Sequence, residues 1–423
     1  MKNFPILLST RLPFFYGWVV LGCASCASFA RQGSAVATLS IFVDPMVQEF
    51  AWSRTAISGA VSIGGLLAAV TSPFLGPLVD RHGARVILCA AALMTGVAAL
   101  GLSLTTSLIM FYGLFCIARM NFAGPFDLGI YGAVNNWFVK LRPQAISTVT
   151  MTHMIGLTAM PLIAHTAMVN DGWRSGWVAI GITVLIIGFL PSFLFMARRP
   201  EDLGLHPDGI PLSNDNENHS PAGVQIRDIE FSRSEATRTP VFWLLLAFTF
   251  MVFPVQAGVS LHQAPHLLER GLEPTAAAMV VSTFSLFSGL SAVVFGMVAR
   301  RFSIHFNLVA TGLFLSLGCI LMIEIATIWE AIFAATLFGI GIGGILCILP
   351  IAWADYFGRS NFGSIRGMVL TIQVSAQAAG PLVSGMLRDW HGDYVISLKL
   401  FFVMSLASAL IAFFSRPPRH LTP

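Results

Sequence analysis

The stretch "GPLVDRHGARVIL", residues 76–88, places a short polar turn between two long apolar runs. A similar turn, "GMVARRFSIH", lies between two later apolar runs at 296–305. The starts of the two copies also correspond, because "FYGWVVLG" at 15–22 is answered by "PVFWLLLA" at 240–247. These correspondences predict a chain built from two similar halves with the same order of helices and turns.

The composition indicates that the protein lies in a lipid bilayer. Of the 423 residues, 56% are hydrophobic and only 10% are charged, which is more apolar side chain than a water-soluble domain can bury. A helix needs about 20 apolar residues to cross the hydrocarbon core. Runs of this kind lie at 15–42, 55–76, 86–104, 108–133, 145–169, 175–196, 241–264, 275–299, 307–326, 331–352, 366–387 and 396–415. We therefore predict an all-α membrane protein of twelve transmembrane helices in two six-helix bundles.

One long polar segment divides these runs into two equal sets. Residues 197–239 are rich in Pro, Ser, Asn and Asp, so we predict an N-terminal bundle at 1–196, a linker at 197–239 and a C-terminal bundle at 240–423. Most basic residues between the runs fall on the linker side, and cytoplasmic loops carry such an excess. Both termini are therefore expected in the cytoplasm, in a multi-pass protein of a bacterial-type inner membrane. The net charge of +4 follows from this bias, and no nucleic-acid partner is predicted.

The turn at 76–85 resembles the signature loop between helices 2 and 3 of the major facilitator superfamily, G-x-L-x-D-R-x-G-x-R. By this resemblance Gly76 and Gly83 permit a tight turn and a close approach of helices. Asp80 accepts hydrogen bonds from the N-terminal amides of a helix in the other half, pairs with a nearby arginine, and keeps the outward-facing state closed inside. The second copy has Arg300 where Asp80 would correspond, which leaves this role to the first half. The implied gating motif is Gly76, Asp80, Arg81, Gly83 and Arg85.

Further stretches resemble one branch of the superfamily, the monocarboxylate and oxalate/formate porters. They are "YGWVV" at 16–20, "VDPMVQEFAWSRTAISGA" at 43–60, "NNWFVKLRPQAIS" at 135–147, "DGWRSGW" at 171–177, "RRPEDLGLHPDG" at 198–209 and "ADYFGRSNFGSIRG" at 354–367. The resemblance implies a rocker-switch secondary transporter, not an enzyme, with its substrate site at the membrane midplane between the halves. It implies no cofactor, and we expect a monomeric functional unit.

Three charged residues lie well inside the apolar runs, away from their ends, namely Arg31, Arg119 and Asp127. A central Arg or Asp costs about 2.5 to 3.5 kcal/mol on the insertion scale, so each needs a partner or a wet cavity. In a purely structural role, the arginines satisfy backbone carbonyls or pair with Asp127. Alternatively, each guanidinium presents a fork of donors that matches a carboxylate, which makes Arg31 and Arg119 candidate ligands of an organic anion.

Proton coupling requires a group that titrates, and two residues are candidates. His153 lies within the fifth run, and a histidine titrates near pH 6.5. Asp127 is the rival candidate, as the acidic residue well inside an apolar run. The structural alternative for His153 is a neutral, hydrogen-bonded residue in helix packing.

The second half is expected to supply only neutral polar groups to the site. Leu290 stands where the carboxylate porters carry an arginine in helix 8, and the run at 367–385 contains no lysine. The candidate substrate contacts here are His262, Gln256, Gln373 and Gln377. The three glutamines suit a hydroxyl, an amide or a ring nitrogen better than a second carboxylate, so we expect either a monoanion or a larger ligand with one acidic and one neutral polar end as substrate. His262 and His266 have a spacing that could hold a metal, but Pro265 between them and the lack of a nearby third ligand argue against one.

Together these features predict proton-coupled uptake of a small organic anion, such as a monocarboxylate. One alternative is an efflux antiporter for amphipathic metabolites or drugs, favoured by the 34 phenylalanines and 17 methionines. Another is a transporter-like sensor that binds its ligand without moving it. The chain has no Walker loop and no hydrolase motif, so neither ATP-driven transport nor hydrolysis is expected. The expected partners are an organic acid, protons and the lipid bilayer.

Overall fold

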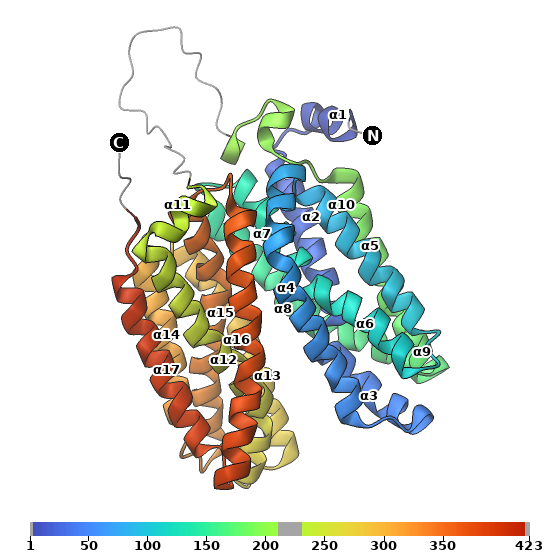
Figure 1. The fold of residues 1–423 in the computed structure, drawn as a ribbon, viewed down its shortest axis with the longest axis vertical. Helices are drawn as coiled ribbons and strands as arrows, with labels where there is room; N and C mark the ends of the chain where they lie inside the picture. The colour runs from blue at the N-terminus through green and yellow to red at the C-terminus, as the bar shows by residue number, and fades with distance from the viewer. Residues whose placement is uncertain (1–2, 210–230, 419–423) are drawn as a thin grey trace.

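The computed structural model describes residues 3–209 and 231–418, and this part of the chain is helical with no strand. Its long helices form two bundles that stand side by side (Figure 1). The first bundle contains α2 (Gly17–Ala30), α3 (Val36–Phe50), α4 (Arg54–His82), α5 (Ala84–Leu102), α6 (Leu108–Ala123), α7 (Pro125–Trp137), α8 (Arg142–Asp171), α9 (Trp173–Thr183) and α10 (Leu190–Phe195). The second contains α12 (Pro240–Glu269), α13 (Pro274–Val298), α14 (Ile304–Leu321), α15 (Ile328–Phe357), α16 (Phe362–His391) and α17 (Val395–Phe414). Two short helices, α1 (Asn3–Arg11) and α11 (Arg233–Arg238), lie at the end that carries the linker.

Ten segments of the described chain are long and apolar enough to cross a membrane. Two further segments bring the number of transmembrane spans to twelve. The helices α2 and α3 have 14 and 15 residues and together form the first span, and α16 is made more polar by Gln373 and Gln377. The prediction of an all-α fold with twelve transmembrane helices in two bundles is confirmed. Within the predicted linker, residues 210–230 lie outside the described part of the chain.

Local sequence explains where several helices begin. The Ser53 hydroxyl accepts a hydrogen bond from the amide of Ala56 at the start of α4. Thr327 and Glu330 form a reciprocal capping box at the start of α15. Gly83 lies alone between α4 and α5 with φ 84°, a conformation that favours glycine because it has no Cβ. The turn within residues 76–88 is therefore a single-residue connection between two long helices.

The predicted continuous helix at 15–42 is wrong, because the chain breaks near the middle of the span. α2 ends at Ala30, residues 31–34 form a 3-10 turn, and Ala35 is extended with ψ 156° before α3 begins. Side chains satisfy backbone carbonyls at the break and beside it. The Thr38 hydroxyl donates to the Gln32 carbonyl at 2.7 Å, and the Ser34 hydroxyl donates to the Ala118 carbonyl at 3.0 Å. Irregular backbone at membrane depth is tolerated where protein surrounds it, which is the case here.

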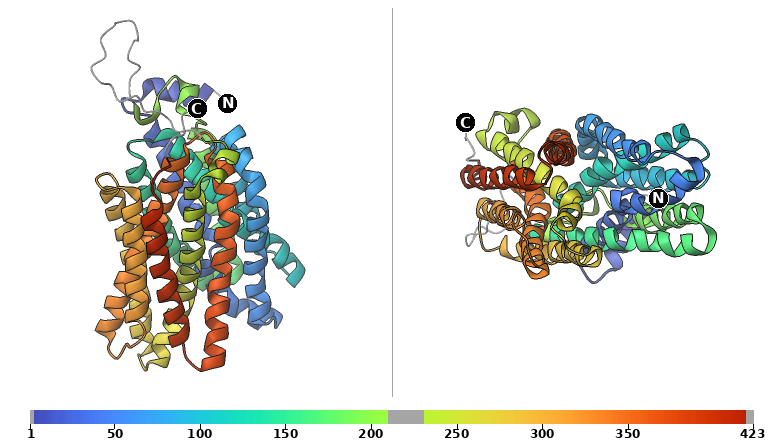
Figure 2. Two further views of the ribbon diagram at one scale, coloured as in Figure 1. Left: turned by 60° about the vertical axis from the view of Figure 1, so that its left-hand side comes forward. Right: turned by 90° about the horizontal axis from the view of Figure 1, so that it is seen from below.

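The two bundles approach each other most closely at the end that carries α1 and α11, which we name the linker end (Figures 1 and 2). There Gly76 of α4 meets Gly363 of α16 so closely that a Cβ on Gly76 would lie 2.2 Å from the Gly363 carbonyl oxygen. The repeat-related Gly296 of α13 makes the equivalent approach to α8, where its Cβ would lie 2.6 Å from that of Ser147. Towards the opposite end the two bundles diverge (Figure 1).

Candidate functional site

The signature turn joins the two bundles through Asp80. This carboxylate accepts hydrogen bonds from the amides of Gly363 and Ser364, at 2.8 and 2.7 Å, and from the Ser364 hydroxyl. These amides belong to the first turn of α16, where free N–H groups and the helix dipole favour an anion. Donors from α16, and not an arginine, make the hydrogen bonds to Asp80 in the described chain. Arg81 is exposed, while Arg85 donates to the Phe193 carbonyl within its own bundle at 2.6 Å.

Two arginines add further contacts between the bundles at the linker end. Arg142 at the start of α8 forms an ion pair with Asp355 of α15. Arg359, which precedes α16, donates to the Asn136 carbonyl of α7 at 3.1 Å and pairs with Glu201 at 2.7 Å. Each half thus sends one arginine to the end of a helix in the other. These contacts hold the linker end closed.

A buried ion cluster lies deeper between the bundles, centred on Asp127. Asp127 falls in the first turn of α7, just after Gly124 interrupts the helical path between α6 and α7. Its carboxylate lies 3.7 Å from the Arg31 guanidinium in the first bundle and 3.2 Å from that of Arg366 in the second. All three side chains are less than a tenth exposed. This carboxylate therefore binds both halves of the protein at once.

Sequence reasoning missed Arg366. The apolar run was expected to begin at this residue, so Arg366 counted as a basic residue of a cytoplasmic loop. α16 instead begins at Phe362, which places Arg366 inside the helix with 2% of its side chain exposed. The expectation of only neutral polar groups from the second half is therefore wrong. The small residues Gly363 and Gly367 beside Arg366 were the available signal, because they mark a tightly packed helix start.

Arg119 lies beside this cluster without an acidic partner of its own. Its guanidinium sits over the Phe122 ring at 4.4 Å, and the Arg31 guanidinium contacts the same ring at 4.5 Å. Gly64 of α4 makes room for the Arg119 stem, since a Cβ there would lie 2.6 Å from that of Arg119. No carboxylate of the described chain forms an ion pair with Arg119, and its buried Nε has no hydrogen-bond partner. The cluster thus holds three arginines and one carboxylate, and only Arg31 and Arg366 pair with that carboxylate among the described residues.

His153 contacts the cluster through a glutamine that the sequence analysis did not single out. Gln32, next to Arg31 in the broken segment, lies with its amide nitrogen 3.0 Å from Nδ1 of His153. The same nitrogen is 3.4 Å from the Ser28 carbonyl, and the Gln32 carbonyl oxygen is buried without a partner. Gly156 on α8 lets Gln32 pack closely, because a Cβ there would be 2.9 Å from the Gln32 stem.

The glutamines of the second bundle lie on facing helices. The Gln377 amide of α16 donates to the Gln256 carbonyl oxygen of α12 at 2.9 Å. Gln373 lies one turn before Gln377, is 9% exposed, and keeps a buried carbonyl oxygen without a partner. Gln373 is also about two turns beyond Arg366 on α16. These groups can hydrogen-bond a neutral polar end of a ligand.

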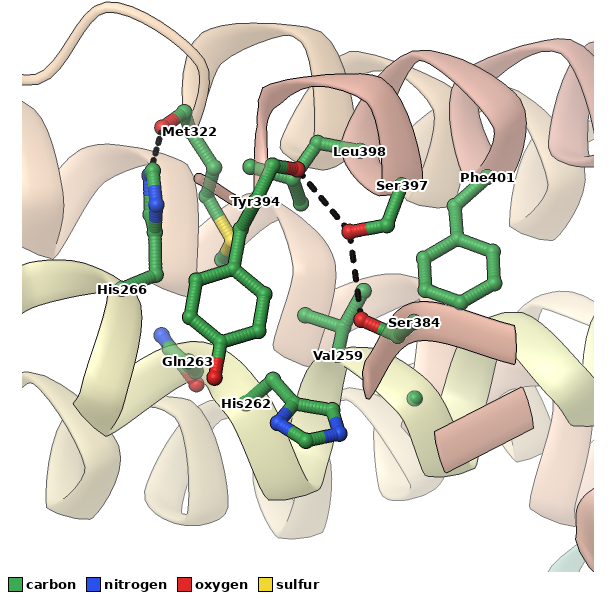
Figure 3. Close-up of a pocket in the computed structure, with 11 residues that line it drawn as sticks. Val259, His262, Gln263, His266, Met322, Ser384, Tyr394, Ser397, Leu398 and Phe401 are labelled. Carbon is green, nitrogen blue, oxygen red and sulfur yellow. Dashed lines mark hydrogen bonds between the residues drawn. The ribbon is translucent and has the colours of Figure 1, made fainter. Parts of the chain in front are cut away.

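The structure does not bring His262 to the arginine cluster. Nε2 of His262 lies 3.1 Å from the Pro381 carbonyl, and its ring packs 5.1 Å from that of Tyr394, among residues of α12, α16 and α17 (Figure 3). The pocket there measures about 10 Å³, room for about one water molecule. His266 lies 2.7 Å from the Met322 carbonyl. No group of three or more metal-binding side chains occurs in the described residues.

Comparison with known proteins agrees with this arrangement. The Major Facilitator Superfamily profile matches residues 20–266 and 258–423, so it covers both halves. The chain is 24% identical to monocarboxylate transporter 12 of Xenopus laevis over 91% of this chain and 85% of that one. It is 22% identical to the oxalate:formate antiporter of Oxalobacter formigenes over 90% and 88% of the two chains.

Solved structures show the same fold. The proton:xylose symporter XylE superposes with a TM-score of 0.74 at 13% identity, over 93% of this chain and 94% of that one. The family profile, the two relatives and the twelve-helix architecture confirm the resemblance found in the signature turn and identify a transporter, not an enzyme. The chain belongs to the Major Facilitator Superfamily, on the branch of the monocarboxylate transporters and the oxalate:formate antiporter.

Proposed function

We propose that this secondary transporter takes up a small monovalent organic anion together with a proton, by a rocker-switch motion of its two bundles. In this proposal the linker end and both termini face the cytoplasm of a bacterial-type cell, and the protein lies in its inner membrane. The excess of Lys and Arg at the linker end supports this orientation. The structure, closed at the linker end, then represents the outward-facing state.

The main support for an anionic substrate is the excess of positive charge in the buried cluster. Arg31 and Arg366 pair with Asp127, and Arg119 contacts the same Phe122 ring as Arg31, so the cluster holds three guanidinium groups and one carboxylate. Charges are expensive at membrane depth, and an unpaired one is the most expensive. An organic anion can pair with these guanidinium groups, because its carboxylate matches their donor fork.

The surroundings of Arg119 support a carboxylic acid with a short apolar part. Arg119 keeps an unpartnered donor, and the Phe122 ring beneath both Arg119 and Arg31 offers an apolar face. Across the bundle interface, Gln373 has an unpartnered carbonyl oxygen, and Gln256 and Gln377 can exchange their mutual hydrogen bond for one to a ligand. We therefore place the carboxylate at Arg31 and Arg119 and a neutral polar end at the glutamines.

Asp127 is the proposed site of the coupled proton. Its carboxylate now occupies donors of Arg31 and Arg366. If a substrate carboxylate replaces it, Asp127 becomes neutral by taking up one proton. The loaded and the empty cluster then have the same total charge, so both can pass through the closed intermediate of the transport cycle. His153 is the second candidate for the coupled proton. It contacts Gln32 and not Arg31, so a change in its protonation would reach Arg31 only through Gln32.

Transport in proteoliposomes tests this function. Vesicles preloaded with unlabelled acetate, lactate or benzoate are diluted into the same labelled acid, and counterflow is compared between wild type, Arg119→Gln and the matched control Arg238→Gln. Arg238 is an exposed arginine in the last turn of α11, away from the cluster. We expect counterflow by wild type and Arg238→Gln, and at least a tenfold loss in Arg119→Gln.

Each other outcome contradicts part of the proposal. Equal counterflow by Arg119→Gln and wild type would remove Arg119 from the site. Ligand-dependent thermal stabilisation without any counterflow would identify a sensor. Counterflow of amphipathic cations but not of any acid would favour the efflux alternative.

A further inference from the structure

A wide hollow lies away from the transport site, on the outer surface of the second bundle. α13 and α14 both pack on α15 and leave a groove of about 640 Å³ between them. This volume falls within the range of about 300 to 1,000 Å³ that is usual for small-molecule sites. Aromatic rings dominate its lining, namely Phe287, Phe295, Phe302, Phe306 and Phe314.

The groove opens towards lipid and not towards the bundle interface. Leu290, Phe302 and Phe306 line it and are 49%, 61% and 52% exposed. Leu290 stands where the carboxylate porters carry an arginine, so in this chain that helix position contributes to the outer surface and not to the arginine cluster. An open apolar groove at membrane depth accepts hydrocarbon chains, because lipid is the solvent there.

Two arginines stand at the mouth of the groove. Arg300 and Arg301 lie in the turn between α13 and α14, flanked by the groove residues Val298 and Phe302. Both side chains are exposed, and neither forms an ion pair with another described residue. The turn lies at the linker end, where the headgroups of one leaflet begin. Basic residues in this position, next to a gap between membrane helices, bind anionic headgroups.

The internal repeat explains why these arginines are free. In the first bundle the corresponding turn carries Asp80, whose carboxylate is occupied by the amides of α16. The second copy has Arg300 at this position, so its turn makes no such bond to the first bundle. The second copy therefore carries the opposite charge at this position, in a longer turn of residues 299–303 between α13 and α14.

We propose that one anionic phospholipid binds here, with an acyl chain in the groove between α13 and α14 and its phosphate at Arg300 and Arg301. The apolar volume and the cationic mouth fit the two ends of one molecule. A free anion would use only the arginines, and a neutral lipid only the groove. The bound lipid would lie on the outer face of α13, whose inner face packs on α8 through Gly296.

Native mass spectrometry of the detergent-purified protein tests this proposal. Wild type is compared with the double variant Arg300→Gln/Arg301→Gln, with the groove-filling variant Leu290→Trp, and with the control Arg238→Gln. Leu290 is half exposed, so a larger side chain there does not require the core to repack. Each protein is titrated with phosphatidylglycerol, with phosphatidylcholine of the same chains, and with inorganic phosphate.

We expect one retained phosphatidylglycerol in wild type and in Arg238→Gln. Its apparent affinity should fall at least tenfold in both the double variant and Leu290→Trp, and should be at least tenfold weaker for phosphatidylcholine. Equal retention by all four proteins, or equal retention of the two lipids, would overturn the proposal. Binding of inorganic phosphate that Leu290→Trp leaves unchanged, without selective phosphatidylglycerol retention, would also overturn it, since this outcome describes an anion site alone.

Discussion

Arg366 donates to Asp127 across the interface between the two bundles, at 3.3 Å from Nε and 3.2 Å from Nη2 to the same carboxylate oxygen. The two residues belong to different halves of the chain, and both are buried. This contact makes the charge of the candidate site part of the attachment between the bundles. A change of protonation or of ligand at Asp127 can therefore act directly on the conformation of the protein.

Replacing Arg366 should loosen this attachment. Removing one partner of a buried ion pair costs about 3 to 5 kcal/mol, and the cost should be smaller here because Arg31 still faces Asp127. We expect Arg366→Gln to lower the unfolding temperature in detergent and to abolish counterflow, and Arg366→Lys to restore most of the stability. An unfolding temperature equal to that of wild type would show that the ion pair contributes nothing to holding the bundles together.

Neutralising Asp127 should separate exchange from proton coupling. In Asp127→Asn the side chain can no longer take up a proton, while the arginines remain available to a substrate. We expect counterflow to persist within about tenfold of wild type, and uptake driven by an inward proton gradient to vanish. The comparison is made in the same proteoliposomes with and without a pH step. Gradient-driven uptake by Asp127→Asn would transfer the coupling role to His153, and His153→Gln is then the variant to measure.

Removing the charge of Asp80 should open the linker end. Hydrogen bonds to a charged group contribute about 1.5 to 3 kcal/mol each, and 1.4 kcal/mol corresponds to a tenfold change in an equilibrium. Spin labels at His82 and at Arg238, exposed positions at the linker end of the two bundles, report their separation by pulsed electron resonance. We expect a longer distance to become populated in Asp80→Asn. An unchanged distance distribution would mean that Arg142 and Arg359 keep this end closed without Asp80.

The glycine contact between α4 and α16 allows a purely steric test. A Cβ at Gly76 would lie 2.2 Å from the Gly363 carbonyl oxygen, so Gly76→Ala must push the helices apart. We expect it to shift the spin-label distance in the same direction as Asp80→Asn and to slow counterflow. Gly113 of α6 is the matched control, since a Cβ there meets no atom within 4 Å. If Gly76→Ala behaves like Gly113→Ala, the close approach does not stabilise the closed end.

Patterns of single residues were enough to predict the helices, the repeat and the family. Apolar runs and the G-x-L-x-D-R-x-G-x-R turn are local features, and a helix must satisfy its own backbone inside a bilayer. The break at 31–35 was not predictable in this way, because it involves contacts with other helices, such as the hydrogen bond from the Ser34 hydroxyl to the Ala118 carbonyl of α6. Arg366 was missed because hydropathy locates a helix end only to within a turn.

The candidate site was therefore predicted in part. Arg31, Arg119 and Asp127 were visible as charges inside apolar runs, and the structure pairs Arg31 with Asp127 and places Arg31 and Arg119 over the same Phe122 ring. Which residues of the second bundle face them depends on the rotation and depth of α12 and α16. Sequence spacing does not fix these quantities, and His262 accordingly lies in a separate pocket.

The break in the first transmembrane span separates it into two helices, α2 and α3, that pack on different parts of the first bundle. α2 packs on α7 and on the inner part of α8, whereas α3 packs on α8 and α9 towards the opposite end of the bundle. Residues 31–35 join them without a continuous helical ladder, so α3 can tilt while α2 stays in place. The first bundle thus has a joint beside the proposed anion site, at which the angle between α2 and α3 can change without breaking a helical hydrogen-bond ladder.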